Sequence, residues 1–211
     1  MAAHLLATRR FRQWTEALAG QLGGEPGPAG VSAHEVPPIV RAFVECAAPE
    51  GMIPAIFRLK QRAEMRLNPG GAWWPLTAKQ VISVQAPGFV WAASMQLAPF
   101  VEASILDAYV DRKGLLEVRL FGSFPLVRAA GPDVGQGELM RYLAELVWVP
   151  QAMLYNSGLS WRVMDETSVE VSAAGPAGSA RMRLLFDGGD VVGFEADDRP
   201  RLANGRIIPT R

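Results

Sequence analysis

Two residues whose side chains are suited to acid–base chemistry lie close together in a segment with strand periodicity. Asp107 and Tyr109 alternate with apolar neighbours over residues 105–110, so the two side chains share one face of the expected strand. Burial on an apolar wall raises the pKa of a carboxyl group, which would suit Asp107 to act as a general acid or base with Tyr109 as its hydrogen-bond partner. The alternative is an Asp107 at the edge of a sheet that only hydrogen-bonds a turn.

A third candidate, Arg141, falls on the helix expected after Gly137. Polar residues recur there at spacings of three and four and therefore form one face of the helix: Glu138, Arg141, Tyr142 and Glu145. Such a face is usually solvated and linked by salt bridges. If it looks into a cavity under a sheet instead, Arg141 would orient an anionic group of a substrate or pair with Asp107.

A further set of residues could line a binding site for an apolar molecule, because it is rich in aromatic rings and methionine. The candidate ligand-binding residues are Met65, Trp74, Trp91, Met95, Tyr109, Arg141, Tyr142, Trp148, Met153 and Trp161. Residues of these types either fill a solid core or line a pocket, and periodicity does not separate the two cases.

Residue counts exclude several other kinds of site. His4 and His34 are the only histidines and Cys46 is the only cysteine, which excludes a zinc cluster, a disulfide framework and, for practical purposes, a Ser/His/Asp triad. The glycines of residues 20–24 follow a helical pattern rather than a strand, so they do not form a phosphate-binding loop. We therefore expect no metal and no cofactor.

Charge and hydropathy limit the partners and the location. The 21 basic and 21 acidic residues leave a formal net charge of zero, so we expect no binding to nucleic acid. No apolar run reaches the length of a membrane span or of a signal-peptide core, so we expect no integral membrane segment. A lone cysteine suits a reducing compartment, which predicts a cytoplasmic protein.

The elements that must position these residues follow from periodicity. Residues 1–24 predict an amphipathic helix with an apolar stripe from Phe11 to Leu22, and the Pro- and Gly-rich residues 25–31 predict a linker. Strict alternation from Ile56 to Leu67 predicts a strand, and turn signals divide residues 73–121 into further antiparallel strands, at least five in all. Residues 137–156 then predict one long helix with a kink at Pro150, followed by more strands.

Segregated helices and strands predict an α+β fold with an antiparallel sheet. We expect a single domain over residues 32–211: a strongly curved sheet, or half-barrel, closed by the one long helix and preceded by N-terminal helices.

Four blocks of sequence in order resemble a bacterial family, the domain-of-unknown-function family numbered 6544. The blocks are VPPIVRAFVECAAPEG, MRLNPGGAWWPLTAKQVISVQAPGFVW, DAYVDRKGLLEVRLFG and GELMRYLAELVWVPQAML. The resemblance covers residues 37–210 and implies a soluble or membrane-tethered bacterial protein, without an activity. The order of elements is also similar to the half-barrel of bacterial lipoprotein carriers, a likeness of architecture that does not define function.

The C-terminal residues differ from that family pattern. Its members continue past the motif GRIIPTR into further strands, whereas this chain stops at Arg211, so we expect a truncated or shorter sheet. An unpaired strand edge can associate with another chain. We therefore expect a homodimer through a free sheet edge, or else a helix at Phe11–Leu22 that folds over the edge and buries Trp14.

Three functions remain open from the sequence. The first is binding of a hydrophobic or amphipathic, lipid-like small molecule in the concavity of the sheet. The second is an enzyme that uses Asp107, Tyr109 and Arg141 for acid–base chemistry in the same cavity. The third is a structural or interaction module with a filled core and an exposed apolar patch.

Overall fold

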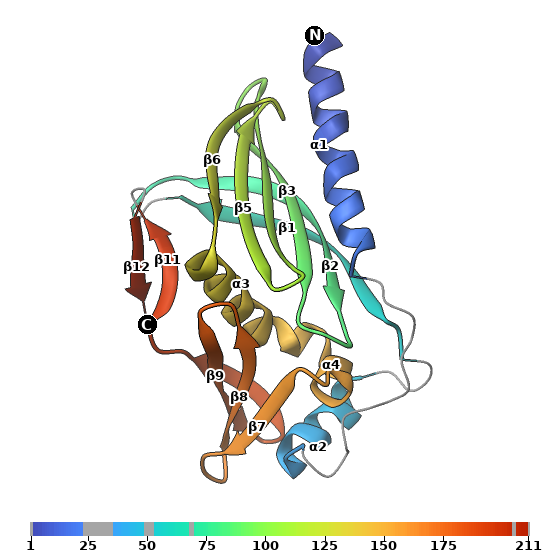
Figure 1. Cartoon of the computed structure of the whole chain (residues 1–211), viewed down its shortest axis with the longest axis vertical. Coiled ribbons are helices and arrows are strands. Elements are labelled where there is room, and N and C mark those ends of the chain that lie inside the picture. Colours follow the sequence, from blue (N-terminus) through green and yellow to red (C-terminus); the bar gives the residue numbers. More distant parts are fainter. Residues whose placement is uncertain (1, 23–35, 49–52, 68–69, 204–205, 211) are drawn as a thin grey trace.

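A computed structural model describes residues 2–22, 36–48, 53–67, 70–203 and 206–210 (Figure 1). The expected linker at residues 25–31 lies outside these residues. The expectation of a single domain over residues 32–211 stays a prediction.

The expected α+β class with antiparallel strands is confirmed. The first sheet has six antiparallel strands in chain order, each joined to the next by a hairpin: β1 (Ile56–Arg66), β2 (Trp73–Ser83), β3 (Phe89–Ala98), β4 (Val101–Val110), β5 (Lys113–Leu120) and β6 (Phe124–Ala130). The second sheet is antiparallel in the order β10-β9-β8-β7, with β7 (Leu159–Val163), β8 (Ser168–Gly175), β9 (Gly178–Asp187) and β10 (Asp190–Glu195). A separate hairpin pairs β11 (Arg199–Ala203) with β12 (Arg206–Thr210).

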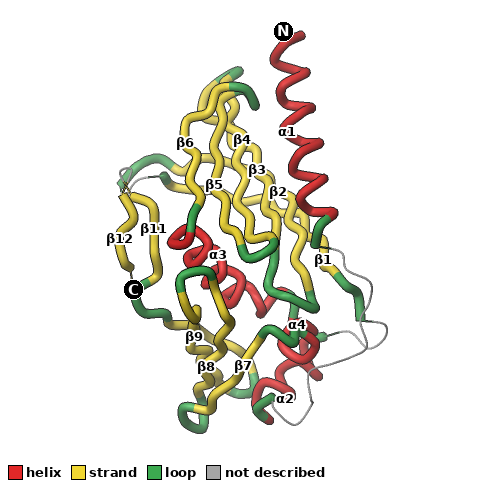
Figure 2. The backbone as a smooth tube through the Cα atoms, in the orientation of Figure 1, coloured by secondary structure: helices red, strands yellow, loops and turns green. Residues whose placement is uncertain are grey.

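The helices connect and cover these sheets (Figure 2). Helix α3 (Pro132–Ala144) lies between the two sheets, where it contacts β4 and β5 of the first sheet and β8 and β9 of the second. Helix α2 (Pro38–Ala47) packs against α4 (Pro150–Tyr155). On the opposite face of the first sheet lies α1 (Ala2–Gly20), which covers β3 and β4. It therefore covers the middle of the sheet. The expectation that this helix would fold over a free edge of the sheet and bury Trp14 there is wrong.

The half-barrel is not confirmed. The six-stranded sheet is open, with β1 and β6 as its unpaired edges, and the rest of the apolar core is supplied by α3 and the second sheet instead of by closure. The expected long helix is also wrong in its extent: it begins at Pro132, not after Gly137, and α3 ends at Ala144. A 3-10 turn, η1 (Glu145–Trp148), follows before α4 begins at Pro150.

Proline explains this interruption. Pro150 has no N–H to donate into the preceding turn, and its ring forces the residue before it out of the helical region. Val149 accordingly has φ −133° and ψ 61°. The break at Pro150 produces a short bend. Helix α3, next to the sheet, carries Glu138 and Arg141, and η1 carries Glu145.

Close backbone contacts hold α3 against the first sheet and against the β11–β12 hairpin. A Cβ atom added at Gly114 of β5 would lie 2.5 Å from backbone atoms of Gly135 in α3, and one at Gly137 would lie 2.7 Å from the carbonyl oxygen of Pro200. Helical glycines normally destabilise a helix by about 1 kcal/mol, so their presence here reflects the close approach of neighbouring backbone. The helix therefore lies near enough to the sheet for its polar side chains to reach β2 and β4.

Candidate functional site

The structure brings Asp107 and Arg141 together at the inner face of the first sheet, the face that α3 covers. Asp107 lies on β4, a central strand, and therefore not at a sheet edge. Arg141 donates one guanidinium N–H to Asp107 Oδ2 and donates its Nε–H to Glu145 Oε1 at 2.8 Å. The three side chains are between 11% and 18% exposed, so the ion pairs are largely removed from solvent. The guanidinium also lies over the rings of two aromatic residues of β3, Phe89 and Trp91, at 4.8 and 5.1 Å.

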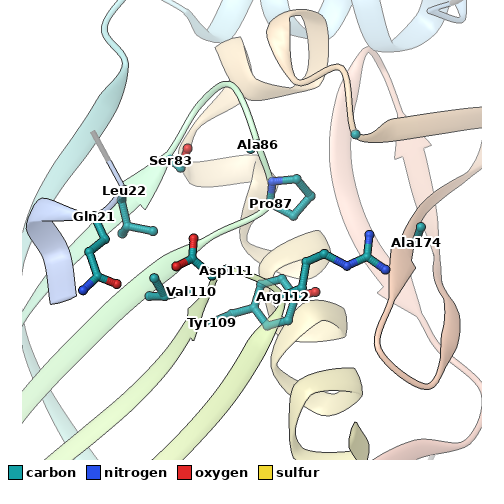
Figure 3. Close-up of a pocket in the computed structure, with 11 residues that line it drawn as sticks. Gln21, Leu22, Ser83, Ala86, Pro87, Tyr109, Val110, Asp111, Arg112 and Ala174 are labelled. Carbon is teal, nitrogen blue, oxygen red and sulfur yellow. The ribbon is translucent and has the colours of Figure 1, made fainter. Parts of the chain in front are cut away.

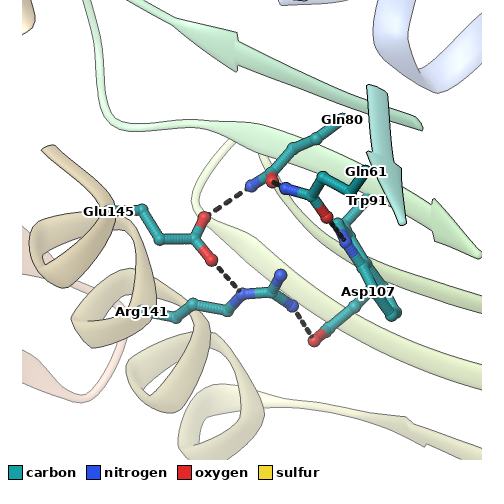
Figure 4. Close-up of polar contacts among 6 residues, drawn as sticks. All are labelled: Gln61, Gln80, Trp91, Asp107, Arg141 and Glu145. Carbon is teal, nitrogen blue, oxygen red and sulfur yellow. Dashed lines mark hydrogen bonds and ion pairs between the residues drawn. The ribbon is translucent and has the colours of Figure 1, made fainter. Parts of the chain in front are cut away.

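Two glutamines extend this network across the sheet (Figure 4). Gln80 of β2 donates its amide N–H to the second oxygen of Glu145. Gln61 of β1 donates to Gln80 Oε1 at 2.8 Å and accepts a hydrogen bond from Trp91 Nε1 at 2.7 Å. The network therefore joins four strands to α3 and η1, and it satisfies polar groups that would be costly to bury alone.

A second carboxyl group, Glu138, lies next to Asp107. Burial raises the pKa of Glu138 well above its usual range, and the charge and hydrogen bond of Asp107 raise it further, against the opposing effect of Arg141 and Arg199. Oxygen atoms Oε2 of Glu138 and Oδ1 of Asp107 are both buried without a hydrogen-bond partner among the described residues. The raised pKa favours the protonated form of Glu138 beside the Asp107 carboxylate.

This arrangement leaves little of Arg141 for a ligand. Burial lowers the pKa of Arg141, but the carboxylates of Glu145 and Asp107 outweigh burial and raise it, so the guanidinium stays charged. Its Nε–H and one Nη1–H are already directed at these carboxylates. A second anion would have to compete with Asp107 and Glu145 for the same cation.

Tyr109 does not hydrogen-bond Asp107. The Tyr109 side chain is 1% exposed, and its hydroxyl group has no hydrogen-bond partner among the described residues. Residues two apart on a strand share a face but are separated by about 6.5 Å along it, which exceeds hydrogen-bonding distance unless the side chains lean together. Instead, Tyr109 lines a pocket at the end of β4.

The pocket has a volume of about 300 Å³ and lies where five parts of the chain meet: the end of α1, the β2–β3 turn, the β4–β5 hairpin, the turn before β7, and β8 (Figure 3). Its lining residues are Gln21, Leu22, Ser83, Ala86, Pro87, Tyr109, Val110, Asp111, Arg112, Gly158 and Ala174. Ligand pockets are commonly about 300–1,000 Å³ in volume, so this one suits a small molecule.

The charged side chains of the pocket come from a strained turn. Asp111 and Arg112 both have positive φ, 49° and 62°, the left-handed conformation that suits a two-residue hairpin but costs a residue other than glycine about 1 kcal/mol or more. The Arg112 side chain points toward Ala174 and donates to the carbonyl oxygen of Gly175 at 3.2 Å, whereas the Asp111 carboxylate points toward Gln21 and Leu22. Burial raises the pKa of Tyr109 and the charge of Arg112 opposes this, so the phenol stays protonated near a cation.

Most of the other candidate ligand-binding residues pack in the core between the sheets. Trp91, Met95, Tyr142 and Met153 are buried there, and Met65, Trp74 and Trp161 are half-buried against the same cluster. Trp148 is 50% exposed on η1. The Tyr142 hydroxyl donates to the carbonyl oxygen of Ser83 at 2.9 Å and accepts from Asn156 at 2.7 Å, so it is fully paired. The structure thus places Tyr109 in a pocket and most of the remaining set in packing positions.

Sequence reasoning missed the two glutamines and Arg112. Gln61 occupies the apolar face of its strand, and a polar residue at a buried position is the informative exception to alternation. Arg112 lies in a tight hairpin turn at a position where a small or flexible residue is expected. An arginine at such a position is a sequence signal of a strained turn.

A comparison with known families decides the relationship of the chain. The model of DUF6544, a family of unknown function, matches residues 30–211. The chain belongs to this family. The resemblance expected from four sequence blocks is therefore confirmed. The matched region of this DUF6544 member begins after α1. The pocket residues Gln21 and Leu22 therefore lie outside the matched region. No curated protein and no solved structure matches the chain.

Two findings on the described residues complete the site. They contain no group of three or more His, Cys, Asp or Glu side chains placed to hold a metal ion. None of the helices in the described ranges has both the length and the apolar character needed to cross a membrane.

Proposed function

We propose that this protein binds a small amphipathic molecule in the pocket at the end of β4. The observation that carries the proposal is Tyr109, a pocket-lining residue whose hydroxyl is buried and has no hydrogen-bond partner among the described residues. Leaving a buried hydroxyl unpaired costs roughly 1–3 kcal/mol, and an acceptor atom of a ligand would supply the missing partner. The cytoplasmic location remains part of the proposal.

The lining defines the chemical class of the ligand. Tyr109 and Arg112 offer hydrogen-bond donors, one of them charged, which suits a carboxylate or a similar acceptor group. Leu22, Pro87 and Val110 offer apolar surface for the rest of the molecule. The position differs from the concavity of the sheet that the sequence suggested, because α3 and the second sheet occupy that face.

Thermal unfolding with simple probes tests this function. Octanoate, hexanoate and benzoate are carboxylates of suitable size, with 1-octanol as the neutral control. A ligand at 100 times its Kd adds about 2.7 kcal/mol to stability, which raises the Tm of a chain this long by about 5–10 °C. We expect a carboxylate to raise the Tm of the wild type more than the alcohol does, and the increase to shrink in Tyr109→Phe and Arg112→Gln.

The matched control is Tyr142→Phe, which removes a hydroxyl of equal burial from outside the pocket. Its Tm is expected to fall, while the rise produced by the carboxylate stays unchanged. Native mass spectrometry of the purified protein adds a search for a molecule that remains bound. No Tm response to any carboxylate and no bound molecule, or equal responses in Tyr109→Phe and wild type, would remove the proposal.

Acid–base catalysis is a second candidate, favoured by the position of Glu138 near Asp107. Burial and Asp107 raise the pKa of Glu138, and a raised pKa is the shift that a general acid requires. Panels of ester, amide and glycoside substrates give the test. Turnover that disappears in both Asp107→Asn and Glu138→Gln supports it; no turnover, or turnover retained in either variant, excludes it.

A further inference from the structure

Two neighbouring hairpins of the first sheet end in exposed apolar tips. The β3–β4 tip carries Phe100, which is 95% exposed, and the β5–β6 connection leads into Phe124, 66% exposed, and Leu126, 56% exposed. The Phe121 N–H donates to the carbonyl oxygen of Glu102, so the two tips lie side by side. Isolated exposed apolar residues are ordinary, but a group of them at one end of a molecule indicates an interaction surface.

Helix α1 adds to the same end of the molecule. Its N-terminal part passes the tips (Figure 1), and a Cβ atom at Gly122 would meet Thr8 at 2.9 Å, so helix and hairpin are in contact there. Leu6, two residues before Thr8 and therefore on the other side of the helix, is 58% exposed. We call the exposed residues Phe100, Phe124 and Leu126 of the two hairpins the apolar tip.

The position of Phe100 is unfavourable for the folded chain by itself. Its φ of 66° places it in the left-handed region, where a bulky side chain is strained. The side chain makes up for none of this by packing, because it is almost entirely exposed. Gln96 donates to the carbonyl oxygen of Ala98, at 2.6 Å, and to that of Val101, which holds the turn in this shape. A strained and exposed aromatic ring on a rigid turn suits an external contact.

Most of the charged residues beside the apolar tip are basic. Arg9, Arg10 and Arg12 are exposed on α1, and the side chain of Arg128 on β6 is 70% exposed and pairs with Glu117. One acid, Glu102, lies two residues after Phe100 and is half-buried. Glu16 is the only acid in α1 and lies in its second half.

The opposite end of the molecule is acidic. The β7–β8 turn holds exposed Asp165 and Glu166, and the β9–β10 turn beside it holds exposed Asp187 and Asp190. Figure 1 places the β7–β8 turn at the far end from the apolar tip. The chain has zero net charge, but its basic and acidic residues are concentrated at opposite ends. A negatively charged surface would therefore attract the end with the apolar tip and repel the end with the β7–β8 turn.

We propose that the apolar tip docks on an anionic lipid surface, with the aromatic rings among the lipid headgroups and Arg9, Arg10 and Arg12 beside lipid phosphates. Phenylalanine and leucine side chains inserted at the interface with arginines around them are the pattern of interfacial binding. A second copy of the chain fits less well, because narrow hairpin tips bury little area against each other and the basic residues of two copies would repel.

Vesicle co-sedimentation tests the proposal with the full chain. The probes are vesicles of phosphatidylcholine mixed with phosphatidylglycerol, and vesicles of phosphatidylcholine alone. We expect binding to the anionic vesicles that falls with added salt. The double variant F100S/F124S is expected to weaken partitioning about tenfold or more, since burial of one phenylalanine contributes about 1.5–3 kcal/mol. R9Q/R10Q is expected to weaken it by a similar factor at about 1 kcal/mol for each arginine.

Matched controls come from the second sheet. Phe194 is 54% exposed on β10, so F194S removes a similar exposed ring far from the tip, and R181Q/R183Q removes two arginines of β9. Both are expected to bind like the wild type, and circular dichroism should show that all variants fold because the replaced side chains are at the surface.

Four results would overturn the proposal: no binding to anionic vesicles, equal binding to neutral ones, full binding by F100S/F124S, or equal loss in F194S. A concentration-dependent dimer in sedimentation that F100S/F124S abolishes would assign the surface to self-association instead. Because none of these variants touches the pocket, failure here is independent of the carboxylate-binding test.

Discussion

Removing one hydroxyl group from each of two equally buried tyrosines separates a functional residue from a structural one. Tyr109 and Tyr142 are both 1% exposed. The Tyr142 hydroxyl has two hydrogen bonds, to the Ser83 carbonyl oxygen and from the Asn156 amide, whereas the Tyr109 hydroxyl has no partner within the described residues. Phenylalanine keeps the ring in each case, so the packing of the core is preserved.

The two substitutions should change the free energy of unfolding in opposite directions. Tyr109→Phe removes a buried unpaired hydroxyl, and we expect stability to rise by about 1 kcal/mol. Tyr142→Phe removes two hydrogen bonds and leaves the Ser83 carbonyl and the Asn156 amide unpaired, and we expect a loss of about 2–3 kcal/mol. For a chain of this length these values correspond to about 3 °C upward and about 6–9 °C downward in Tm.

Urea unfolding followed by tryptophan fluorescence and by circular dichroism measures both effects in the absence of ligand. The m value should stay constant, so that a change in midpoint reports stability alone. Tyr155→Phe, at the half-buried third tyrosine of the chain, is the control for loss of a hydroxyl and should change stability by less than about 0.5 kcal/mol.

A loss of stability in Tyr109→Phe comparable to that in Tyr142→Phe would refute the reasoning. It would mean that the Tyr109 hydroxyl is paired in the folded protein and is not held in reserve for a ligand. A gain in stability together with a loss of carboxylate binding is the combination that the pocket requires, because binding groups are often placed at the expense of stability.

Three further results are expected. Burial and the neighbouring Asp107 raise the pKa of Glu138 above its usual 4.5, so the folded state holds a proton that the unfolded state releases. The free energy of unfolding should therefore fall as pH rises from about 4.5 through the folded-state pKa. In a pH series of urea unfolding curves, Glu138→Gln should remove this fall. Arg141→Met should lower the free energy of unfolding by about 3 kcal/mol, because it leaves two largely buried carboxylates without their cation. The control Arg162→Met, in an exposed ion pair, should lower it by less than about 1 kcal/mol. Equal losses in the two variants would contradict this account of the network. Gly114→Ala places a Cβ atom 2.5 Å from the backbone of α3 and should lower the Tm by the equivalent of about 2 kcal/mol. The control Gly20→Ala, with open space around the new Cβ atom, should leave the Tm almost unchanged. An unchanged Tm for Gly114→Ala would show that α3 does not approach so closely.

Local patterning was sufficient for much of the fold. Alternation along residues 56–67 and the turn signals after it depend only on neighbouring residues, and they predicted consecutive antiparallel strands that the structure contains. The same applies to the polar spacing that placed Arg141 and Glu145 four residues apart, and these two side chains form an ion pair. Absence of histidine and cysteine clusters was equally readable from composition.

The arrangement of the sheets was not readable in this way. Alternation shows that one face of a strand is buried, but it does not show what buries it. A half-barrel closed on itself and an open sheet covered by α3 and a second sheet require the same apolar positions. Pro150 signalled a kink, but no local signal showed that the backbone of α3 lies against Gly114 and Pro200.

The sequence by itself therefore determined the class of the fold, the family and the residue types available for chemistry, because these depend on composition and on short-range periodicity. Only the tertiary structure decided which of those residues meet. It paired Asp107 with Arg141, placed Tyr109 at a pocket near Arg112 with no hydrogen-bond partner for its hydroxyl among the described residues, and brought two hairpin tips next to α1. These contacts join segments far apart in the chain, and their geometry depends on how layers pack, which no local pattern encodes.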